Sequence, residues 1–228
     1  MNCPFCNGWM GSSVRDMFQC EDCGLFRKGN IPTPELMKKR GRDFMLSACF
    51  DSSTRDKRMA EADNDLQLLE TYIEPGKMLD VGAAGGFMMK VAMDRGWLVR
   101  GCDISERSIE WAAEHFDISI EFGMLRDIEL TDGEFDVVVF WNTLEHLLDP
   151  AVALRIAKMS LKAGGFIYLK VPVKNRKGVV DKYEELHTTE FGRKNLSSYL
   201  SLIGFDVVKQ VFYDRGTFSA MLLLVQKR

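Results

Sequence analysis

Apolar runs alternate with amphipathic stretches from about residue 61 to the end of the chain. Short runs rich in β-branched residues favour buried strands, whereas apolar residues three and four positions apart favour helices. Near-continuous apolar strands separated by helices are typical of a parallel sheet that is covered on both faces. Helices are expected over 62–73, 87–95, 105–115, 151–161 and 194–203, and strands over 78–81, 98–102, 118–122, 136–141 and 166–171.

The last part of the chain departs from this alternation. Two further strands, over 205–213 and 218–226, are separated by only four residues, Asp214 to Thr217. A parallel crossover needs about a dozen residues or more, so these two strands must run antiparallel. The pattern therefore predicts an α/β fold with a mostly parallel sheet and a reversed last strand.

The first sixty residues lack the alternation. Residues 1–30 hold four of the six cysteines, and residues 31–34 read Ile-Pro-Thr-Pro, which favours an extended linker before a helix over 35–45. We therefore expect three parts: a small module at 1–30, a linker or helical cap at 31–60, and a main domain at 61–228.

The composition is that of a globular protein without the net positive charge that favours nucleic-acid binding. A chain of 228 residues with 46% hydrophobic and 28% charged residues can bury a sizeable core. The net charge of −3 and the pI of about 5.7 disfavour a nucleic-acid partner. No apolar run approaches the roughly 20 residues of a membrane span. Residues Met1 to Pro4 lack the basic and apolar regions of a secretory signal, so we expect a cytoplasmic, reducing compartment.

The cysteines near the N-terminus form two C-x2-C pairs, which are Cys3 with Cys6 and Cys20 with Cys23. In a reducing compartment such crowding favours a metal over disulfides. Two thiolates separated by two residues can hold one cation, and two such pairs close a tetrahedral Zn²⁺ site. Four buried thiols without a metal are the alternative. With four protein ligands the site would be closed, so the expected zinc is structural and supplies folding energy to a zinc-ribbon-like module.

A glycine-rich loop follows the first predicted strand of the main domain. It reads Leu-Asp-Val-Gly-Ala-Ala-Gly-Gly over 79–86 and leads into a helix. Small residues let the backbone approach a ligand closely, and the helix N-terminus offers free N–H groups. Asp103 ends the second strand twenty-one residues after Gly82, where a carboxylate can accept both hydroxyls of a ribose. The combination predicts a nucleoside site at the carboxyl ends of the strands.

Two features of the loop argue against a dinucleotide. The spacing G-x-G-x-x-G is not met, because position 84 is Ala and Gly85 and Gly86 are adjacent. The carboxylate of Asp80 would repel a pyrophosphate, but it suits a cationic ligand. S-adenosylmethionine carries an ammonium and a sulfonium group beside a ribose diol, so it is the predicted cofactor.

Several motifs of the main domain resemble those of a known family. Residues 79–86 look like motif I of the class I S-adenosylmethionine-dependent methyltransferases, and residues 135–150 are similar to their fourth-strand motif, with the Leu-Glu-His-x-x-Asp-Pro form of the ubiquinone-biosynthesis-type branch. Residues 161–165 resemble the turn before strand five. The resemblance covers roughly 61–228 and implies a Rossmann-like, seven-stranded sheet. A short Cys-pair module ahead of such a domain also resembles bacterial members of the branch.

The resemblance implies a set of cofactor contacts, with two departures. The family usually has Gly at the position of Ala84, and many relatives have Gly-Asp where this chain has Gly123-Met124. We therefore expect adenine to be held by backbone and by the apolar side chains of Met124 and Leu125. The implied contacts are Asp80, Gly82, Ala83, Ala84, Gly86, Asp103, Ile104, Met124, Leu125, Trp141 and Asn142.

Three ionisable residues are candidates for catalysis. Glu145 and His146 follow the fourth strand, although Glu145 could simply favour a helix start and His146 need not be catalytic. His187 lies in the polar segment 183–191, which resembles a His-x-x-x-Phe segment that covers the pocket in the family. A neutral His187 with a pKa near 6.5 could take a proton from an attacking hydroxyl or amine, or it could brace this lid.

The leading interpretation is a methyltransferase for a small-molecule acceptor, such as a sugar, lipid-linked or phenolic metabolite. The alternatives are an RNA or protein methyltransferase that uses the zinc module to bind a macromolecule, and a non-catalytic S-adenosylmethionine-binding protein. The acidic total and the absence of an aromatic and basic stripe disfavour nucleobase chemistry. A nicotinamide oxidoreductase fits least.

Overall fold

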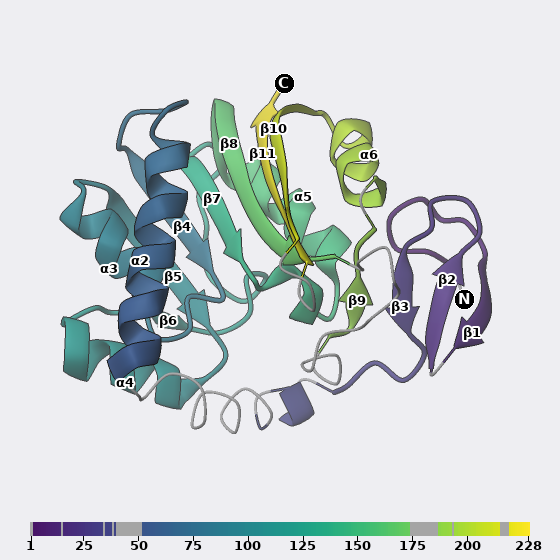
Figure 1. The fold of residues 1–228 in the computed structure, drawn as a ribbon, viewed down its shortest axis with the longest axis horizontal. Helices are drawn as coiled ribbons and strands as arrows, with labels where there is room; N and C mark the ends of the chain where they lie inside the picture. The colour runs from purple at the N-terminus through teal and green to yellow at the C-terminus, as the bar shows by residue number, and fades with distance from the viewer. Residues whose placement is uncertain are drawn as a thin grey trace.

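Two sheets organise the chain (Figure 1). The computed structural model describes residues 2–14, 16–33, 35–37, 39, 52–173, 187–192, 194–214 and 219–228. The larger sheet has seven strands in the order β10-β11-β8-β7-β4-β5-β6, and the smaller has four in the order β1-β2-β3-β9. Most of the helix predicted over 35–45 lies outside the described residues.

The larger sheet confirms the predicted α/β architecture. Its neighbours pair in parallel, except that β11 runs antiparallel to both β8 and β10. The third predicted strand is shorter than expected: only Glu121 and Phe122 pair with β5, and Ile118 N donates instead to Ala112 O of helix α4 at 3.4 Å. The strands are β4 (Lys77–Val81), β5 (Leu98–Asp103), β6 (Glu121–Phe122), β7 (Phe135–Trp141), β8 (Leu161–Pro172), β10 (Phe205–Asp214) and β11 (Ser219–Lys227).

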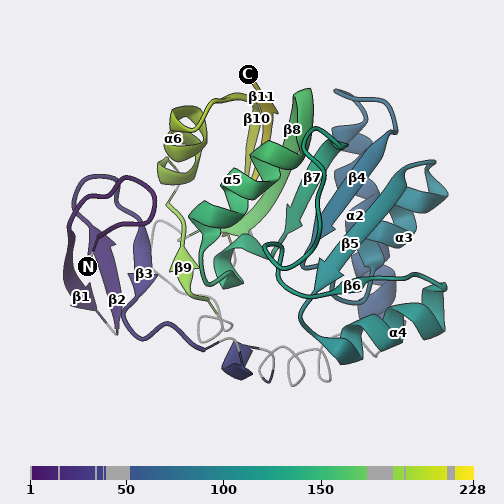
Figure 2. The same ribbon diagram turned by 180° about the vertical axis from the view of Figure 1, so that it is seen from behind.

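Helices cover both faces of this sheet. Helices α2 and α3 share one apolar cluster with it, and α5 and α6 share another (Figures 1 and 2). The side chain of Ser105 caps α4, as predicted, by accepting from the Ser108 N–H. None of the helices in the described part of the chain has the length and apolar character needed to cross a bilayer. The helices are α2 (Ser52–Leu69), α3 (Phe87–Asp94), α4 (Glu106–Phe116), α5 (Pro150–Ser160) and α6 (Asn195–Leu202).

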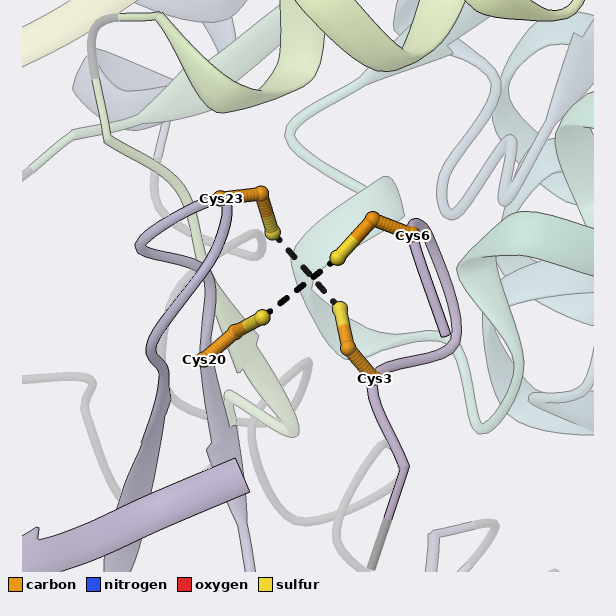
Figure 3. A group of neighbouring side chains, drawn as sticks. All are labelled: Cys3, Cys6, Cys20 and Cys23. Carbon is orange, nitrogen blue, oxygen red and sulfur yellow. Dashed lines mark hydrogen bonds between the residues drawn. The ribbon is translucent and has the colours of Figure 1, made fainter. Parts of the chain in front are cut away.

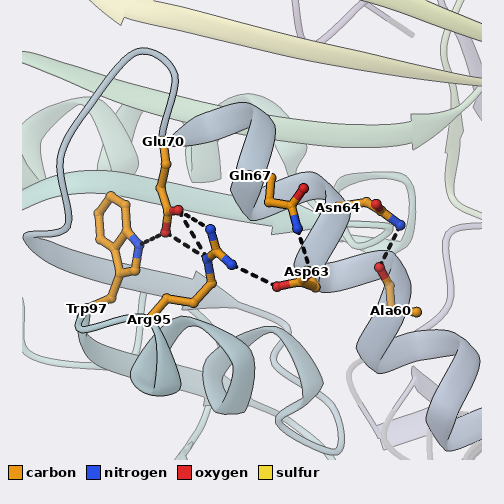
Figure 4. Close-up of polar contacts among 7 residues, drawn as sticks. All are labelled: Ala60, Asp63, Asn64, Gln67, Glu70, Arg95 and Trp97. Atoms are coloured by element: carbon orange, nitrogen blue, oxygen red, sulfur yellow. Dashed lines mark hydrogen bonds and ion pairs between the residues drawn. The ribbon is translucent and has the colours of Figure 1, made fainter.

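Helix α2 begins ten residues before the predicted start at 62, and polar contacts hold its C-terminal end (Figure 4). The carboxylate of Glu70 accepts from Arg95 Nε and from Trp97 Nε1, each at 3.0 Å. Arg95 also donates to Asp63 of α2 at 2.9 Å. Charge-assisted hydrogen bonds of this kind are stronger than neutral ones, so they fix α2 to the connection between α3 and β5.

The smaller sheet takes strands from two distant parts of the chain. Its strand β9 (Thr189–Glu190) pairs antiparallel with β3 (Phe26–Lys28), next to α6 (Figures 1 and 2). The ring of Phe5 stacks on Tyr199 of α6, with 4.1 Å between centroids and 12° between planes. The N-terminal residues therefore pack into the same apolar cluster as α5 and α6. The remaining strands are β1 (Met10–Val14) and β2 (Met17–Cys20).

Candidate active site

A cavity opens at the carboxyl ends of β4, β5 and β7, which is the edge of a doubly wound sheet where ligands bind. The predicted glycine-rich loop, the acid at the end of β5 and the residues after β7 meet there. The predicted site residues that line the cavity are Gly82, Ala84, Asp103, Ile104, Met124, Leu125, Asn142 and His146.

The backbone of the loop is held in an unusual conformation. Gly82 and Gly86 both have φ 73°, and a Cβ on Gly82 would lie 2.3 Å from Thr143 Cγ2. Only glycine fits that position without displacing the threonine. Ala84 also has a positive φ, 49°, which is strained for a residue with a Cβ. Its N–H donates to Asp103 Oδ2 at 2.8 Å, a charge-assisted bond that helps to stabilise this conformation.

Asp103 connects the loop to α4. One carboxylate oxygen accepts from Ala84 N, and the other accepts from Ser105 N, each at 2.8 Å. Burial raises the pKa of Asp103, and these N–H donors oppose that rise. Each carboxylate oxygen has a second lone pair, so a side chain fixed in this way at the cavity wall can still accept from two vicinal hydroxyls.

Some predicted contacts lie away from the cavity. Trp141 lies on the α2 side of the sheet, where its Nε1 donates to Asp65 Oδ2 at 2.8 Å. Asp80 is only 2% exposed, and burial together with the charge of Asp103 raises its pKa to about 7. A cationic ligand nearby would favour the charged form of Asp80. The predicted contacts that do not line the cavity are Asp80, Ala83, Gly86 and Trp141.

The three candidate catalytic residues lie together beside the cavity. Glu145 and His146 belong to the 3-10 helix η1 (Leu144–His146) directly after β7, and His187 comes just before β9. His146 Nε2 lies 3.8 Å from Glu145 Oε1. The rings of His146 and His187 pack edge to face, with 5.0 Å between their centroids. Only His146 of the three lines the cavity.

Burial dominates the protonation of this group. It raises the pKa of Glu145 to about 8, and Glu145 Oε2 has no hydrogen-bond partner among the described residues. Burial and the neighbouring His146 lower the pKa of His187 to about 3. The expected pKa near 6.5 for His187 is therefore wrong, because the ring lies in the protein interior and not in an open polar loop. Residues 183–186 of the predicted lid lie outside the described residues.

Among the residues that the structure describes, two groups of side chains could hold a metal ion. The four predicted cysteine sulfurs lie within 4.8 Å of one another, with 3.6 Å between Cys3 and Cys23 and 3.4 Å between Cys6 and Cys20 (Figure 3). A Zn–S distance of about 2.3 Å gives a tetrahedral edge of about 3.8 Å, so small shifts of these sulfurs would fit zinc. The ligand atoms of Glu145, His146 and His187 also lie within 4.8 Å of one another.

Further cavity residues were not predicted from the sequence. Ser105 and Thr143 adjoin predicted residues in the chain, and Ser108 lies one helical turn beyond Ile104, so proximity to the motifs could have indicated them. Met37 lies far from every motif, and no local signal places it at the cavity. The additional lining residues are Met37, Val81, Cys102, Ser105, Ser108, Gly123, Thr143, Leu147 and Leu148.

The fold and the loop with its acid are typical of nucleoside-binding α/β proteins of the doubly wound class. A family model described as a methyltransferase domain matches residues 53–210, which is more than half of the chain. The chain therefore belongs to this family, within the class I S-adenosylmethionine-dependent methyltransferases.

The chain is similar to ubiquinone biosynthesis O-methyltransferases. It is 34% identical over 110 residues to that of Thiobacillus denitrificans, and 33% identical over 109 residues to that of Neisseria meningitidis serogroup A. Each match covers 44% of this chain and 46% of the relative. The chain therefore spans about half the length of the curated relatives it matches.

Solved structures share the fold at low sequence identity. A Pyrococcus horikoshii protein has a TM-score of 0.65 at 19% identity and covers 84% of this chain and 99% of its own. An S-adenosylmethionine-dependent methyltransferase from Archaeoglobus fulgidus has a TM-score of 0.63 at 17% sequence identity. The match covers 74% of this chain and 94% of that protein. A [4+2]-cyclase has a TM-score of 0.62 at 17% sequence identity, and the match covers 72% of this chain and 80% of the cyclase. The fold by itself therefore does not fix the reaction.

Substituting Asp103→Asn should weaken S-adenosylhomocysteine binding by about 10- to 100-fold, because a hydrogen bond to a charged group contributes about 1.5–3 kcal/mol. Calorimetric titration measures this affinity. The matched control is Asp94→Asn, which removes a carboxylate that pairs with Lys90 on the surface of α3. Equal affinity in a folded Asp103→Asn variant would show that the ribose is held elsewhere.

Substituting Glu145→Gln should reduce the dependence of stability on pH. The pKa of Glu145 is about 8 in the folded protein and about 4.3 in the unfolded chain, so its contribution is complete below pH ~4.3 and is lost as the pH rises toward 8. Urea unfolding at pH 5 and pH 8 should show a smaller loss in this variant than in the wild type. An exposed control, Glu114→Gln, should lose as much as the wild type; equal losses in all three proteins would contradict the prediction.

Proposed function

We propose that the protein transfers a methyl group from S-adenosylmethionine to a hydroxyl of a small-molecule acceptor. The observation that carries the proposal is one cavity whose lining includes Asp103, residues of the glycine-rich loop and His146. The relatives named as O-methyltransferases support a hydroxyl acceptor. A sugar, a lipid-linked metabolite or a phenol would supply such a group.

Each residue has a separate task in this proposal. S-adenosylmethionine, when bound, supplies a methyl group made electrophilic by its sulfonium. Asp103 accepts from the ribose hydroxyls and thereby fixes the position of the nucleoside. The acceptor oxygen forms the new O–CH3 bond as the S–CH3 bond breaks, and His146 takes the proton of that acceptor hydroxyl. Alignment of the reacting atoms supplies much of the acceleration.

Glu145 and His187 support His146 from the protein interior. With a pKa of about 8, Glu145 carries its proton at neutral pH, and with a pKa of about 3, His187 is uncharged. Neither group places a fixed charge beside His146 under these conditions. His146 itself lines the cavity, where an acceptor reaches it.

Incubation with methyl-labelled S-adenosylmethionine and a panel of phenols and sugars should give labelled ether and S-adenosylhomocysteine in equal amounts. Substituting His146→Gln should lower turnover by about 10²- to 10⁴-fold, because the amide cannot take a proton. S-adenosylhomocysteine affinity, measured by calorimetry, should stay within a few-fold of the wild type.

His115→Gln is the matched control for this experiment, because His115 is an exposed histidine on α4. It should keep full turnover. Label found only in RNA or protein would favour a macromolecular acceptor, and cofactor binding without any transfer would favour a binding protein. Full turnover of the His146→Gln variant would remove His146 from the chemistry.

We further propose that the four cysteines hold one structural zinc ion, a composition that suits a reducing compartment. Elemental analysis should find one zinc per chain in protein purified without chelator. Cys20→Ser should lose the metal and lower the unfolding temperature, because metal binding contributes folding energy. Cys102→Ala, which removes a buried thiol outside the cluster, should retain the zinc. Protein free of metal would contradict the proposal.

A further inference from the structure

The cavity wall after β7 depends on hydrogen-bond donors from other parts of the chain. Residues 144–148 form a single 3-10 turn and an extended exit, and His146, Leu147 and Leu148 line the cavity. So short a turn leaves most of its carbonyl groups without partners of its own, and buried carbonyls need partners. The partners come from Thr188 and Arg27.

Thr188 holds two of these carbonyls. Its N–H donates to Glu145 O at 2.8 Å, and its hydroxyl lies 2.7 Å from Leu147 O and 3.1 Å from Glu145 O. Thr188 is completely buried. Arg27 holds a third carbonyl, because its Nη2 donates to Leu148 O at 2.7 Å. Three carbonyls in four residues of the cavity wall are therefore fixed from outside the wall.

Both sets of donors are connected to the four-cysteine module. Arg27 lies on β3, four residues after Cys23, and it pairs with Thr189 of β9. Lys28 N donates to Thr188 O at 3.0 Å, so β3 also fixes the backbone of Thr188. The turn that holds Cys20 and Cys23 thus leads directly into β3, the strand that supports the cavity wall.

Arg27 is also electrostatically connected to the same module. Arg27 is 8% exposed, and its Nη1 has no hydrogen-bond partner among the residues that the structure describes. Burial disfavours the charged guanidinium and lowers its pKa, whereas Asp149 and Cys3 of the module oppose that effect. A buried cation needs compensating charge. Four thiolates around one Zn²⁺ carry a net negative charge, which would stabilise Arg27 in place.

We infer that the four-cysteine module is a positioning unit for the cofactor cavity, and that Arg27 and Thr188 are the positioning residues through which it acts. With the module intact, these two residues hold the carbonyls of 145–148 and keep His146, Leu147 and Leu148 at the cavity wall. Loss of either donor, or of the zinc, releases the wall and weakens nucleoside binding. The inference rests on the proposed cofactor, and it adds a role for the module beyond folding.

Two variants test the donors in zinc-loaded protein. Arg27→Ala should weaken S-adenosylhomocysteine binding by about tenfold or more, and Thr188→Val, which removes the hydroxyl at nearly constant shape, by about three- to tenfold. Calorimetry measures the affinities at a temperature where each variant is shown to be folded. Arg27→Lys, which retains the charge, should recover part of the affinity.

Two matched controls accompany these variants. Thr71→Val removes an exposed hydroxyl that also donates to a backbone carbonyl, that of Leu68. Trp9→Ala changes the 60% exposed side chain on the surface of the module. Both should bind S-adenosylhomocysteine as the wild type does. Equal affinity in folded Arg27→Ala and Thr188→Val variants would overturn the inference.

A metal cycle separates positioning from a general loss of stability. Removing zinc from the wild type should lower S-adenosylhomocysteine affinity, whereas removing it from the Arg27→Ala variant should lower affinity much less, because the connection is already broken. Equal losses in the two proteins would contradict coupling through Arg27. A wild type that does not bind S-adenosylhomocysteine would instead refute the proposed function, so the two failures are distinguishable.

Discussion

Buried backbone groups need hydrogen-bond partners, and this constraint shapes the whole carboxyl edge of the larger sheet. Parallel strands end there in loops that cannot satisfy themselves. After β4 and β5, the carboxylate of Asp103 accepts from the N–H groups of Ala84 and Ser105. After β7, Thr188 and Arg27 donate to the backbone carbonyls of Glu145, Leu147 and Leu148. The cavity keeps its shape because these partners come from elements that are themselves well packed.

Charge burial is the second constraint on the site. Asp80, Asp103 and Glu145 all have raised pKa values because they lie in the interior. Asp80, with a pKa of about 7, is partly neutral at neutral pH and gains charge when a cationic ligand approaches. The buried guanidinium of Arg27 is the opposite case, a cation that needs a negative neighbour. Ligand and metal binding would therefore change the electrostatics of the site as well as fill it.

The small sheet joins the two ends of the chain. Three of its strands lie within residues 10–28, before the methyltransferase match at 53–210. The fourth strand, 189–190, lies near the end of that match. Phe5 adds an aromatic contact with Tyr199 on α6. Because the smaller sheet includes β9 from the later part of the chain and shares an apolar cluster with the larger sheet, the module is anchored to the domain that holds the cavity.

Local patterns determined the strand and helix order, the reversed hairpin strand, the cysteine pairs and the loop with Asp103, because periodicity, turn length and motif spacing act over a few residues. Only the tertiary structure decided which face Trp141 occupies, how far burial lowers the pKa of His187, and that Met37 reaches the cavity. It also decided that β9 joins β3. These outcomes depend on which distant segments pack together, and burial and strand pairing between residues far apart leave no mark on the local sequence.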